Sequence, residues 1–126
     1  MTAADGERIR HAIDAAEAGG TGRIAVRIVP ESEADALERA KAEFLQGRLH
    51  EHESRNVALV LVAPRARSFA IVGDRALHER VGDPFWEELV VRTRPYFARG
   101  RIADGIVFAV ERLGETLREH FPEAPA

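Results

Sequence analysis

The segment VALVLVA, from Val57 to Ala63, constrains the fold of this chain more than any other feature. It is a short, continuous run of apolar residues between two polar stretches, GRLHEHESRN and PRAR. A strand that is apolar on both of its faces is typical of the middle of a sheet that is covered on both sides. The run therefore predicts a central strand with helices packed on the faces of the sheet.

Two further strands are expected beside the central one. RIAVRIV, residues 23–29, alternates strictly and places Ile24, Val26 and Ile28 on one face, as at a sheet edge. SFAIVG, residues 68–73, follows the central strand after the turn-compatible residues PRAR. Two short apolar runs with such a connection are typical of a hairpin. The third strand should thus run antiparallel to the second.

Helical periodicity accounts for most of the remaining chain. In the second predicted helix, Ser32 is the expected cap, and Leu37, Phe44 and Leu45 belong to the expected apolar stripe. Pro95 is predicted to break or kink the helix in which it falls. The expected helical segments span roughly residues 5–18, 33–46, 75–80, a stretch that begins at Asp83, and 102–119.

The order of these elements predicts an α/β fold. A strand, a helix and a second strand normally form a right-handed crossover between parallel strands, so the first two strands should be parallel neighbours. The expected architecture is a three-layer-like sandwich in which about four to five helices flank a small mixed central sheet. A single domain over residues 1–122, followed by a short tail at 123–126, fits a chain of 126 residues.

Composition narrows the classes of partner. The chain has 18 basic and 21 acidic residues and a net charge of -3, which disfavours nucleic acid and anionic membranes as partners. It has no cysteine, which excludes a disulfide framework and a thiolate nucleophile. No segment approaches the roughly 20 apolar residues of a transmembrane helix, and the N-terminus does not resemble a signal peptide. These features predict a cytoplasmic protein without a transmembrane segment.

The segment VGDRALHERVGDPFWEEL, residues 72–89, contains the tripeptide Val-Gly-Asp twice. In an antiparallel hairpin, the end of the third strand lies beside the start of the second, so Asp74 should be a neighbour of Asn56 and Thr21. Arg65 and Arg67 of the predicted hairpin should lie at the opposite end of the sheet. The acidic end favours a cation, and the arginine-bearing end favours an anion.

The acidic end contains the candidate metal ligands. Asp74, Asp83, Glu87 and Asn56 offer the oxygen donors that Ca²⁺ or Mg²⁺ prefers. The alternative is structural: Asp74 and Asp83 can each cap a helix, and Glu87 can be a solvated residue of an acidic first turn. His78 is a candidate general acid or base, and its alternative is an exposed histidine on a short helix.

Other chemistries find less support. HEHE, residues 50–53, lacks the spacing that places two imidazoles on one helical face, which favours a polar surface loop. No serine lies in a Gly-x-Ser-x-Gly elbow, and no glycine-rich phosphate loop is present. The simplest interpretation of Trp86 and Phe85 is that they are core residues of a helix.

Four segments together resemble a known family, the TPM domain, sometimes called the TPM phosphatase domain. They are HAIDAAEAGGTGRIAVRIV, RNVALVLVA, SFAIVGDRALHERVGDPFWEELV and PYFARGRIADGIVFAVERLGETLREHFP. The resemblance covers about residues 9–122 and is greatest to short, stand-alone bacterial members. It implies an α/β sandwich, calcium binding at an acidic pocket and acid phosphatase activity, which have been associated with members in photosynthetic membranes that take part in photosystem repair.

The resemblance also assigns positions in this sequence. Glu17 and Thr21 match a Glu-x-x-x-Thr before the first strand, and Asn56 matches an asparagine that opens the second. Gly73 matches a glycine at the end of the third strand, and Asp83 matches an acidic residue at a helix start.

This chain departs from the family pattern at two places. Val57 replaces a common glycine, and Asp74 and Ala76 replace the tyrosine and second glycine of a Gly-Tyr-Gly-Leu sequence. The second departure adds a carboxylate at the acidic end and weakens the transfer of a catalytic mechanism.

Two hypotheses follow. The first is a metal-dependent phosphatase that binds Ca²⁺ or Mg²⁺ through Asp74, Asp83 and Glu87, with Asn56 in support, and hydrolyses a phosphomonoester with Asp74 and His78 as its catalytic residues. The second is a non-catalytic interaction module in membrane-protein or envelope quality control. It would bind a membrane-associated protein partner through the same pocket or an exposed strand edge.

Overall fold

The computed structural model describes residues 1–30 and 35–123 of the chain. β2 is the central strand of the three-stranded sheet that these residues form, with the order β1-β2-β3. The elements are α1 (Ala3–Glu17), β1 (Arg23–Ile28), α2 (Ala36–Gln46), the short 3-10 helix η1 (Leu49–Glu51), β2 (Val57–Ala63), β3 (Ser68–Gly73), α3 (Arg75–Ala98) and α4 (Ile102–His120).

The sheet has the predicted mixed topology. β1 and β2 are parallel, with Ala25 opposite Leu59, and β2 and β3 form an antiparallel hairpin, with Val60 opposite Ile71. Every residue of β2 is buried, as its uninterrupted apolar sequence predicts. β3 is left as one edge strand of the sheet, and this position determines the site described below.

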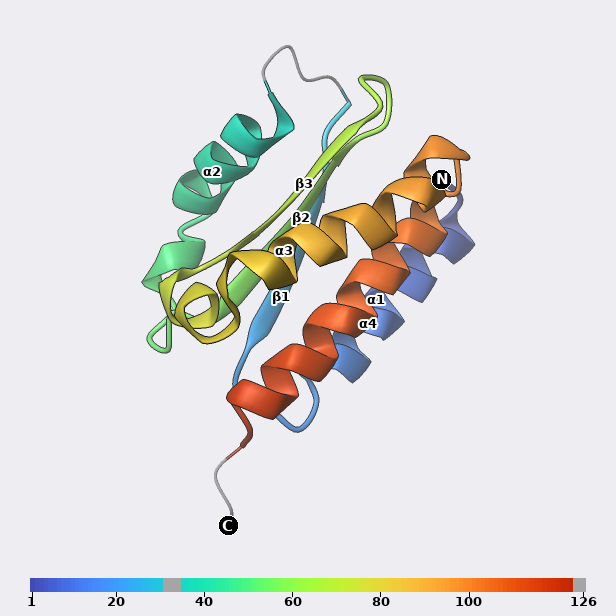
Figure 1. Cartoon of the computed structure of the whole chain (residues 1–126). Coiled ribbons are helices and arrows are strands. Elements are labelled where there is room, and N and C mark those ends of the chain that lie inside the picture. The colour runs from blue at the N-terminus through green and yellow to red at the C-terminus, as the bar shows by residue number, and fades with distance from the viewer. Residues whose placement is uncertain (31–34, 124–126) are drawn as a thin grey trace.

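Helices cover both faces of the sheet and make three layers (Figure 1). Because side chains alternate along a strand, Leu59 and Leu61 of β2 pack in a cluster with Phe44 of α2. Val60 and Val62 point the other way, into a larger cluster with α1, α3 and α4. The predicted α/β sandwich is therefore confirmed, with one helix on one face and three on the other.

α2 differs from its prediction in its start and in its buried face. Its N-cap is Asp35, whose carboxylate accepts a hydrogen bond from the backbone N–H of Leu37 at 2.7 Å. The predicted cap, Ser32, lies outside the described residues. Phe44 of the predicted stripe is buried, together with Ala36 and Ala40, whereas Leu37 and Leu45 are exposed.

α3 combines the predicted short turn and the helix after it. The two parts meet at Gly82, whose φ of 73° lies in the left-handed region that glycine adopts without strain. The predicted break at Pro95 is absent, because α3 continues through Pro95 to Ala98 and Gly82 is its only residue with non-helical backbone angles. Ring contacts hold this last turn: Phe97 packs on Phe69 with centroids 4.6 Å apart.

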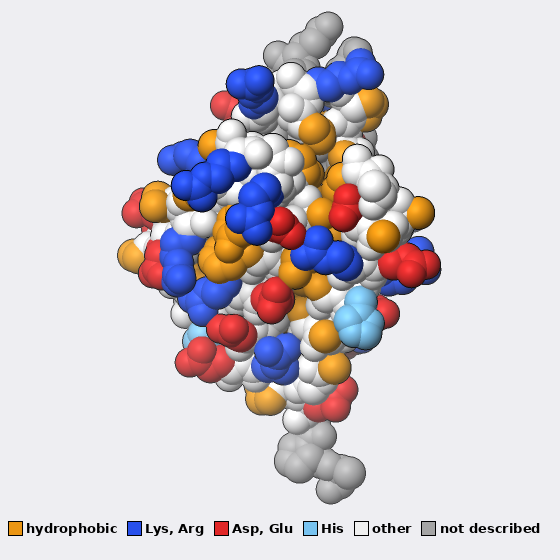
Figure 2. Space-filling model, turned by 90° about the vertical axis from the view of Figure 1, so that its right-hand side faces the viewer, with side chains coloured by type: hydrophobic (Ala, Val, Ile, Leu, Met, Phe, Trp, Pro, Cys, Tyr) orange, Lys and Arg blue, Asp and Glu red, His pale blue; other side chains and the backbone are white. Residues whose placement is uncertain are grey.

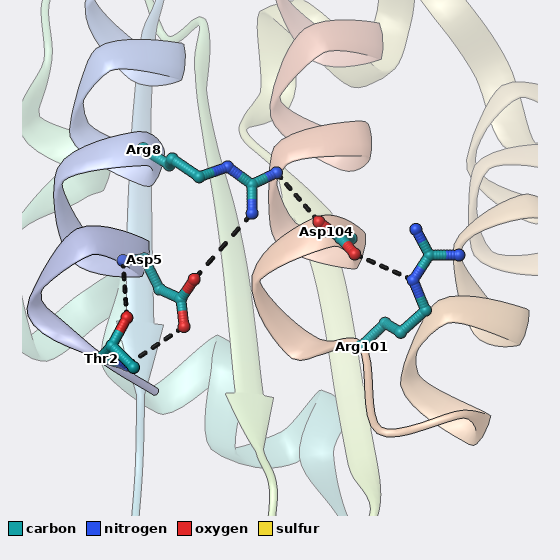
Figure 3. A network of polar contacts seen from close by, with 5 residues as sticks. All are labelled: Thr2, Asp5, Arg8, Arg101 and Asp104. Atoms are coloured by element: carbon teal, nitrogen blue, oxygen red, sulfur yellow. Dashed lines mark hydrogen bonds and ion pairs between the residues drawn. The ribbon is translucent and has the colours of Figure 1, made fainter.

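A polar network joins the first turns of α1 and α4 (Figure 3). The Asp104 carboxylate accepts hydrogen bonds from Arg8 and from Arg101, each at 2.9 Å. These two bonds lower the pKa of Asp104 below its ordinary value. In α1 itself, Thr2 and Asp5 form a reciprocal capping box.

The C-terminal segment returns to the loop that precedes β1. Pro122 forms an isolated bridge with Gly20, and the backbone N–H of Glu123 donates to the carbonyl of Gly19 at 3.2 Å. The predicted tail at 123–126 thus begins with a residue that contacts the domain, and residues 124–126 lie outside the described part. None of the described helices is long and apolar enough to span a bilayer.

Candidate functional site

A pocket of about 490 Å³ lies at the end of the sheet where β3 meets α3. We call it the α2–β3–α3 pocket, after the three elements that form most of its wall. Volumes of this order are typical of sites that bind small ligands or single side chains. Its lining includes Lys41, His50, Arg55, Asp74, His78 and Trp86, together with the end of β3.

The pocket opens along the free edge of β3. It is lined by Ile71, Val72 and Gly73, three consecutive residues of the strand. Ile71 belongs to the apolar cluster under α3 and α4, whereas Val72 packs on the cluster under α2. A hollow that touches residues facing opposite layers must lie at the strand's edge rather than on one face of the sheet.

The backbone at this edge is available for pairing. The N–H of Asp74 donates to the carbonyl of Val57 at 2.8 Å, which places this residue pair in the hydrogen-bonded register. In an antiparallel ladder the register alternates, so the backbone groups of Ile71 and Gly73 point away from β2. Within residues 1–30 and 35–123, β3 pairs with no strand except β2.

Trp86 forms one wall of the pocket because residue 73 has no side chain. A Cβ atom on Gly73 would lie 2.4 Å from Cζ2 and 2.5 Å from Cη2 of the Trp86 ring. The indole therefore packs directly on the backbone at the end of β3. Trp86 packs against the core, as the sequence favoured, but it is only partly buried and also presents aromatic surface at the pocket.

Arg55 and Asp74 form an ion pair at the base of the pocket. The Arg55 Nε and Nη2 atoms donate to the two carboxylate oxygens of Asp74 at 2.6 and 2.7 Å. The hydrogen bond to Asp74 raises the pKa of Arg55 above its ordinary value. Asp74 Oδ1 also accepts from the backbone N–H of Arg75 at 2.7 Å, so the carboxylate caps α3 as its structural alternative predicts.

His78 is held at the rim of the pocket by Trp86. The indole Nε1 donates to His78 Nδ1 at 3.0 Å, which leaves Nε2 as the ring nitrogen that can face a ligand. His78 Nε2 lies 3.6 Å from Asp83 Oδ1, and the Asp83 side chain is 80% exposed. The imidazole therefore lies between the Trp86 indole and the Asp83 carboxylate.

Asn56 lies beneath the pocket and has a structural role. It is fully buried, and its Nδ2 donates to Thr21 Oγ1 at 3.0 Å, so the predicted neighbourhood of these residues is confirmed. Its Oδ1 is buried and has no hydrogen-bond partner within the described residues. The amide links the start of β2 to the loop that precedes β1.

The predicted metal ligands are not brought together as one set. Asp74 lines the pocket but is engaged by Arg55, whereas Asp83 and Glu87 are exposed side chains outside its lining. Among the described residues, no group of three or more histidine, aspartate or glutamate side chains is placed to hold a metal ion. The arrangement does not fit a site with three carboxylate ligands, and the cation site stays a prediction.

Sequence reasoning missed the basic side chains of the pocket. Arg55 adopts a left-handed backbone conformation with φ of 52°, which no sequence pattern indicated. Lys41 interrupts the predicted apolar stripe of the second helix and His50 falls in the predicted surface loop, yet both line the pocket. The register did contain one usable signal, because a basic residue immediately before Asn56 must lie near the end of β3.

Comparison with known protein families adds the decisive observation. The TPM domain matches this chain over residues 1–116 of 126.

The chain belongs to the TPM domain family.

Solved structures agree with this assignment. The BA42 protein of the psychrophilic bacterium Bizionia argentinensis is 30% identical, with a TM-score of 0.88, over 97% of this chain and 84% of that chain. The N-terminal domain of the Corynebacterium glutamicum protein cg2496 is 17% identical, with a TM-score of 0.72, over 98% of this chain and 78% of that one. An N-terminal domain from P. gingivalis, also 17% identical, has a TM-score of 0.81, over 99% of this chain and 83% of that chain. The last two show a shared fold, and no protein of curated function matches.

The TPM positions assigned from the sequence have physical roles in this structure. Glu17 Oε2 accepts a hydrogen bond from the backbone N–H of Ile24 at 2.8 Å and so fixes the start of β1. Thr21 holds Asn56, and Gly73 makes room for Trp86. These residues shape the end of the TPM domain at which the pocket lies.

Proposed function

We propose that this TPM domain is an interaction module whose α2–β3–α3 pocket receives an extended segment of a partner protein. The observation that carries the proposal is the position of the pocket along the unpaired edge of β3. An extended peptide that joins a free edge gains backbone hydrogen bonds, and neighbouring pockets select its side chains. The outward backbone groups of Ile71 and Gly73 are the ones that a peptide would pair with.

The lining of the pocket defines the segment that fits. Trp86 and Phe44 offer apolar surface for one side chain. Arg55 is already paired with Asp74, so Lys41 and His50 are the lining residues that can attract an acidic side chain of the partner. A segment that alternates apolar and acidic residues is therefore complementary. A membrane-associated protein in envelope quality control is the partner that the resemblance to other TPM domains implies.

The test is an NMR titration of the ¹⁵N-labelled protein with an acetylated hexapeptide of alternating valine and aspartate. Shifts should concentrate on the amides of Ile71 and Gly73 and on the Trp86 indole. A peptide with lysine in place of aspartate should bind more weakly, and one with N-methylated backbone amides should not bind. Equal shifts with all three peptides, or none at millimolar concentration, would rule out strand addition.

A second candidate function is hydrolysis of phosphomonoesters with Ca²⁺ or Mg²⁺. It is favoured by one observation: a carboxylate and an imidazole, Asp74 and His78, line the same pocket. Binding of a cation by Asp74 would require its carboxylate to leave Arg55. The exposed side chains of Asp83 and Glu87 would have to turn toward it, with Asn56 in support from below.

The cation hypothesis has its own test. Thermal melting with and without millimolar Ca²⁺, paired with turnover of p-nitrophenyl phosphate, should be measured for the wild type, Asp74→Asn and Arg55→Gln. A cation site predicts a higher Tm with Ca²⁺ in the wild type, a larger rise in Arg55→Gln, and loss of both the rise and turnover in Asp74→Asn. An unchanged Tm with turnover at the buffer background in all three proteins excludes it.

A further inference from the structure

We propose that a second pocket, at the opposite end of the sheet, binds a small organic phosphate through three arginines. This hairpin-end pocket has a volume of about 690 Å³ and lies between the β2–β3 turn, the last turns of α3 and the start of α4. It shares no lining residue with the α2–β3–α3 pocket. The inference is therefore independent of the proposed function.

The first observation is a group of three arginines that have no acidic partner among the described residues. Arg67 of the β2–β3 turn, Arg94 of α3 and Arg99, the residue after α3, line the pocket, and none of its lining residues in the described part of the chain is acidic. Over residues 1–30 and 35–123, none of these three side chains forms an ion pair with an aspartate or glutamate. Asp104, in the first turn of α4, already accepts from Arg8 and Arg101 (Figure 3).

This concentration of positive charge is unusual for the molecule. The whole chain carries a net charge of -3, and seven of its other arginines form an ion pair with a carboxylate: Arg8, Arg39, Arg48, Arg55, Arg92, Arg101 and Arg112. Figure 2 shows that Lys and Arg side chains outnumber Asp and Glu side chains on the upper part of one face, toward the end of the molecule where the hairpin lies in Figure 1, although acidic side chains lie among them. Uncompensated charge of one sign raises the local concentration of a ligand of the opposite sign.

The second observation is an apolar floor beneath the arginines. Phe69 and Phe97 are half-buried, line the pocket and pack on each other with centroids 4.6 Å apart. Ile102 of α4 adds aliphatic surface to the same wall. A ligand with a charged head and an apolar or aromatic body would contact both parts of the pocket.

The third observation is the position of the pocket in the fold. Val62 and Ala63, the last residues of β2, form part of its lining. Ligands of open α/β sheets typically bind beyond the carboxyl ends of the parallel strands, and β2 is one of the two parallel strands here. Guanidinium groups bind phosphate oxygens through two hydrogen bonds each, so three arginines suit a dianionic phosphate better than a single carboxylate.

The test uses benzylphosphonate, a phosphate analogue that cannot be hydrolysed as an ester. Its affinity is measured by calorimetry and by NMR titration, beside inorganic phosphate and benzyl alcohol. We expect benzylphosphonate to bind more tightly than either fragment, with NMR shifts at Phe69, Phe97 and Ile102. The double variant R94Q/R99Q should weaken binding by at least about tenfold.

Arg10→Gln is the matched control. Arg10 is an exposed arginine of α1 that lines none of the pockets named here, so its loss changes net charge without touching the site. It should retain the wild-type affinity. The proposal is overturned if R94Q/R99Q binds as tightly as R10Q, or if the shifts fall outside the hairpin-end pocket. Since the exposed Arg94 and Arg99 make no described polar contacts through their side chains, both variants should fold.

Discussion

Arg55 and Asp74 lie at adjacent ends of β2 and β3 and share two hydrogen bonds, at 2.6 and 2.7 Å. The Asp74 side chain is 5% exposed, and the Arg55 side chain is 34% exposed. A carboxylate this buried requires a partner, because an unpaired buried charge is strongly destabilising. The pair therefore commits the acidic residue of the pocket to a structural role and leaves the remaining pocket basic and aromatic.

Asp74→Ala should lower the free energy of unfolding by about 2 kcal/mol or more, because it removes the cap of α3 and the partner of Arg55. Asp74→Asn should lower it less, since asparagine still caps a helix and the cap is worth about 1 kcal/mol. Urea unfolding of both variants measures the difference. Equal losses would show that the cap contributes nothing.

Gly73→Ala should displace the Trp86 ring, because the new Cβ would lie 2.4 Å from its nearest ring atom. We expect a loss of about 1–3 kcal/mol in stability. The emission of Trp86, the one tryptophan of the chain, should shift to the red as the ring becomes more exposed.

Gly6→Ala is the matched control for this change. Gly6 lies inside α1, and a Cβ there would meet no atom within 4 Å. The substitution should stabilise the protein by about 0.5–1 kcal/mol through helix propensity. If Gly73→Ala and Gly6→Ala have the same effect on stability and on Trp86 emission, Trp86 does not pack on the backbone of β3 as described.

The pH dependence of stability should include a contribution from Asp104. Hydrogen bonds from Arg8 and Arg101 lower the folded-state pKa of this carboxyl, so its stabilisation is fully present above the unfolded pKa of about 3.9. It is lost as the pH falls through the lower folded-state pKa. The gap in unfolding free energy between the wild type and Asp104→Asn should therefore be larger at pH 7 than at pH 2.

Asp14→Asn removes one negative charge from α1 at a side chain without an ion pair in the described part of the chain, and it serves as the control. Chemical unfolding at the two pH values gives both gaps. A gap for Asp104→Asn that does not change with pH would mean that the network in Figure 3 does not affect stability.

The sequence was sufficient to predict the sheet because its signals were strong and local. The unbroken apolar run of β2, the alternation of β1 and the turn before β3 together predict two strand pairings, and both are present. The buried face of α2 and the end of α3 depend on tertiary packing and were harder to predict from the sequence. Leu37 and Leu45 fit a helical stripe, but α2 turns its alanines and Phe44 toward the closely approaching sheet and leaves both leucines exposed. Pro95 does not end α3, because ring packing at Phe97 holds the last turn in place.

The sequence was sufficient to predict where the candidate site lies, but not which side chains line it. The antiparallel register correctly brings Asp74 to the end of the sheet that contains Asn56. The register also places Arg55, the residue before Asn56, near the end of β3. It carries no information on Lys41 of α2 or His50 of η1, which approach the pocket only in three dimensions. Together these three residues change an expected acidic site into one that is basic and aromatic.

The most direct test of the proposed function is a pair of NMR titrations on one ¹⁵N-labelled sample, first with the acidic hexapeptide and then, in a fresh aliquot, with CaCl₂. We predict that the peptide shifts the amides of Ile71 and Gly73 and the Trp86 indole, whereas millimolar Ca²⁺ leaves the resonances of Asp74 and His78 in place. Shifts of Asp74 and His78 with Ca²⁺, together with no response to the peptide, would contradict the account and favour the cation-dependent phosphatase.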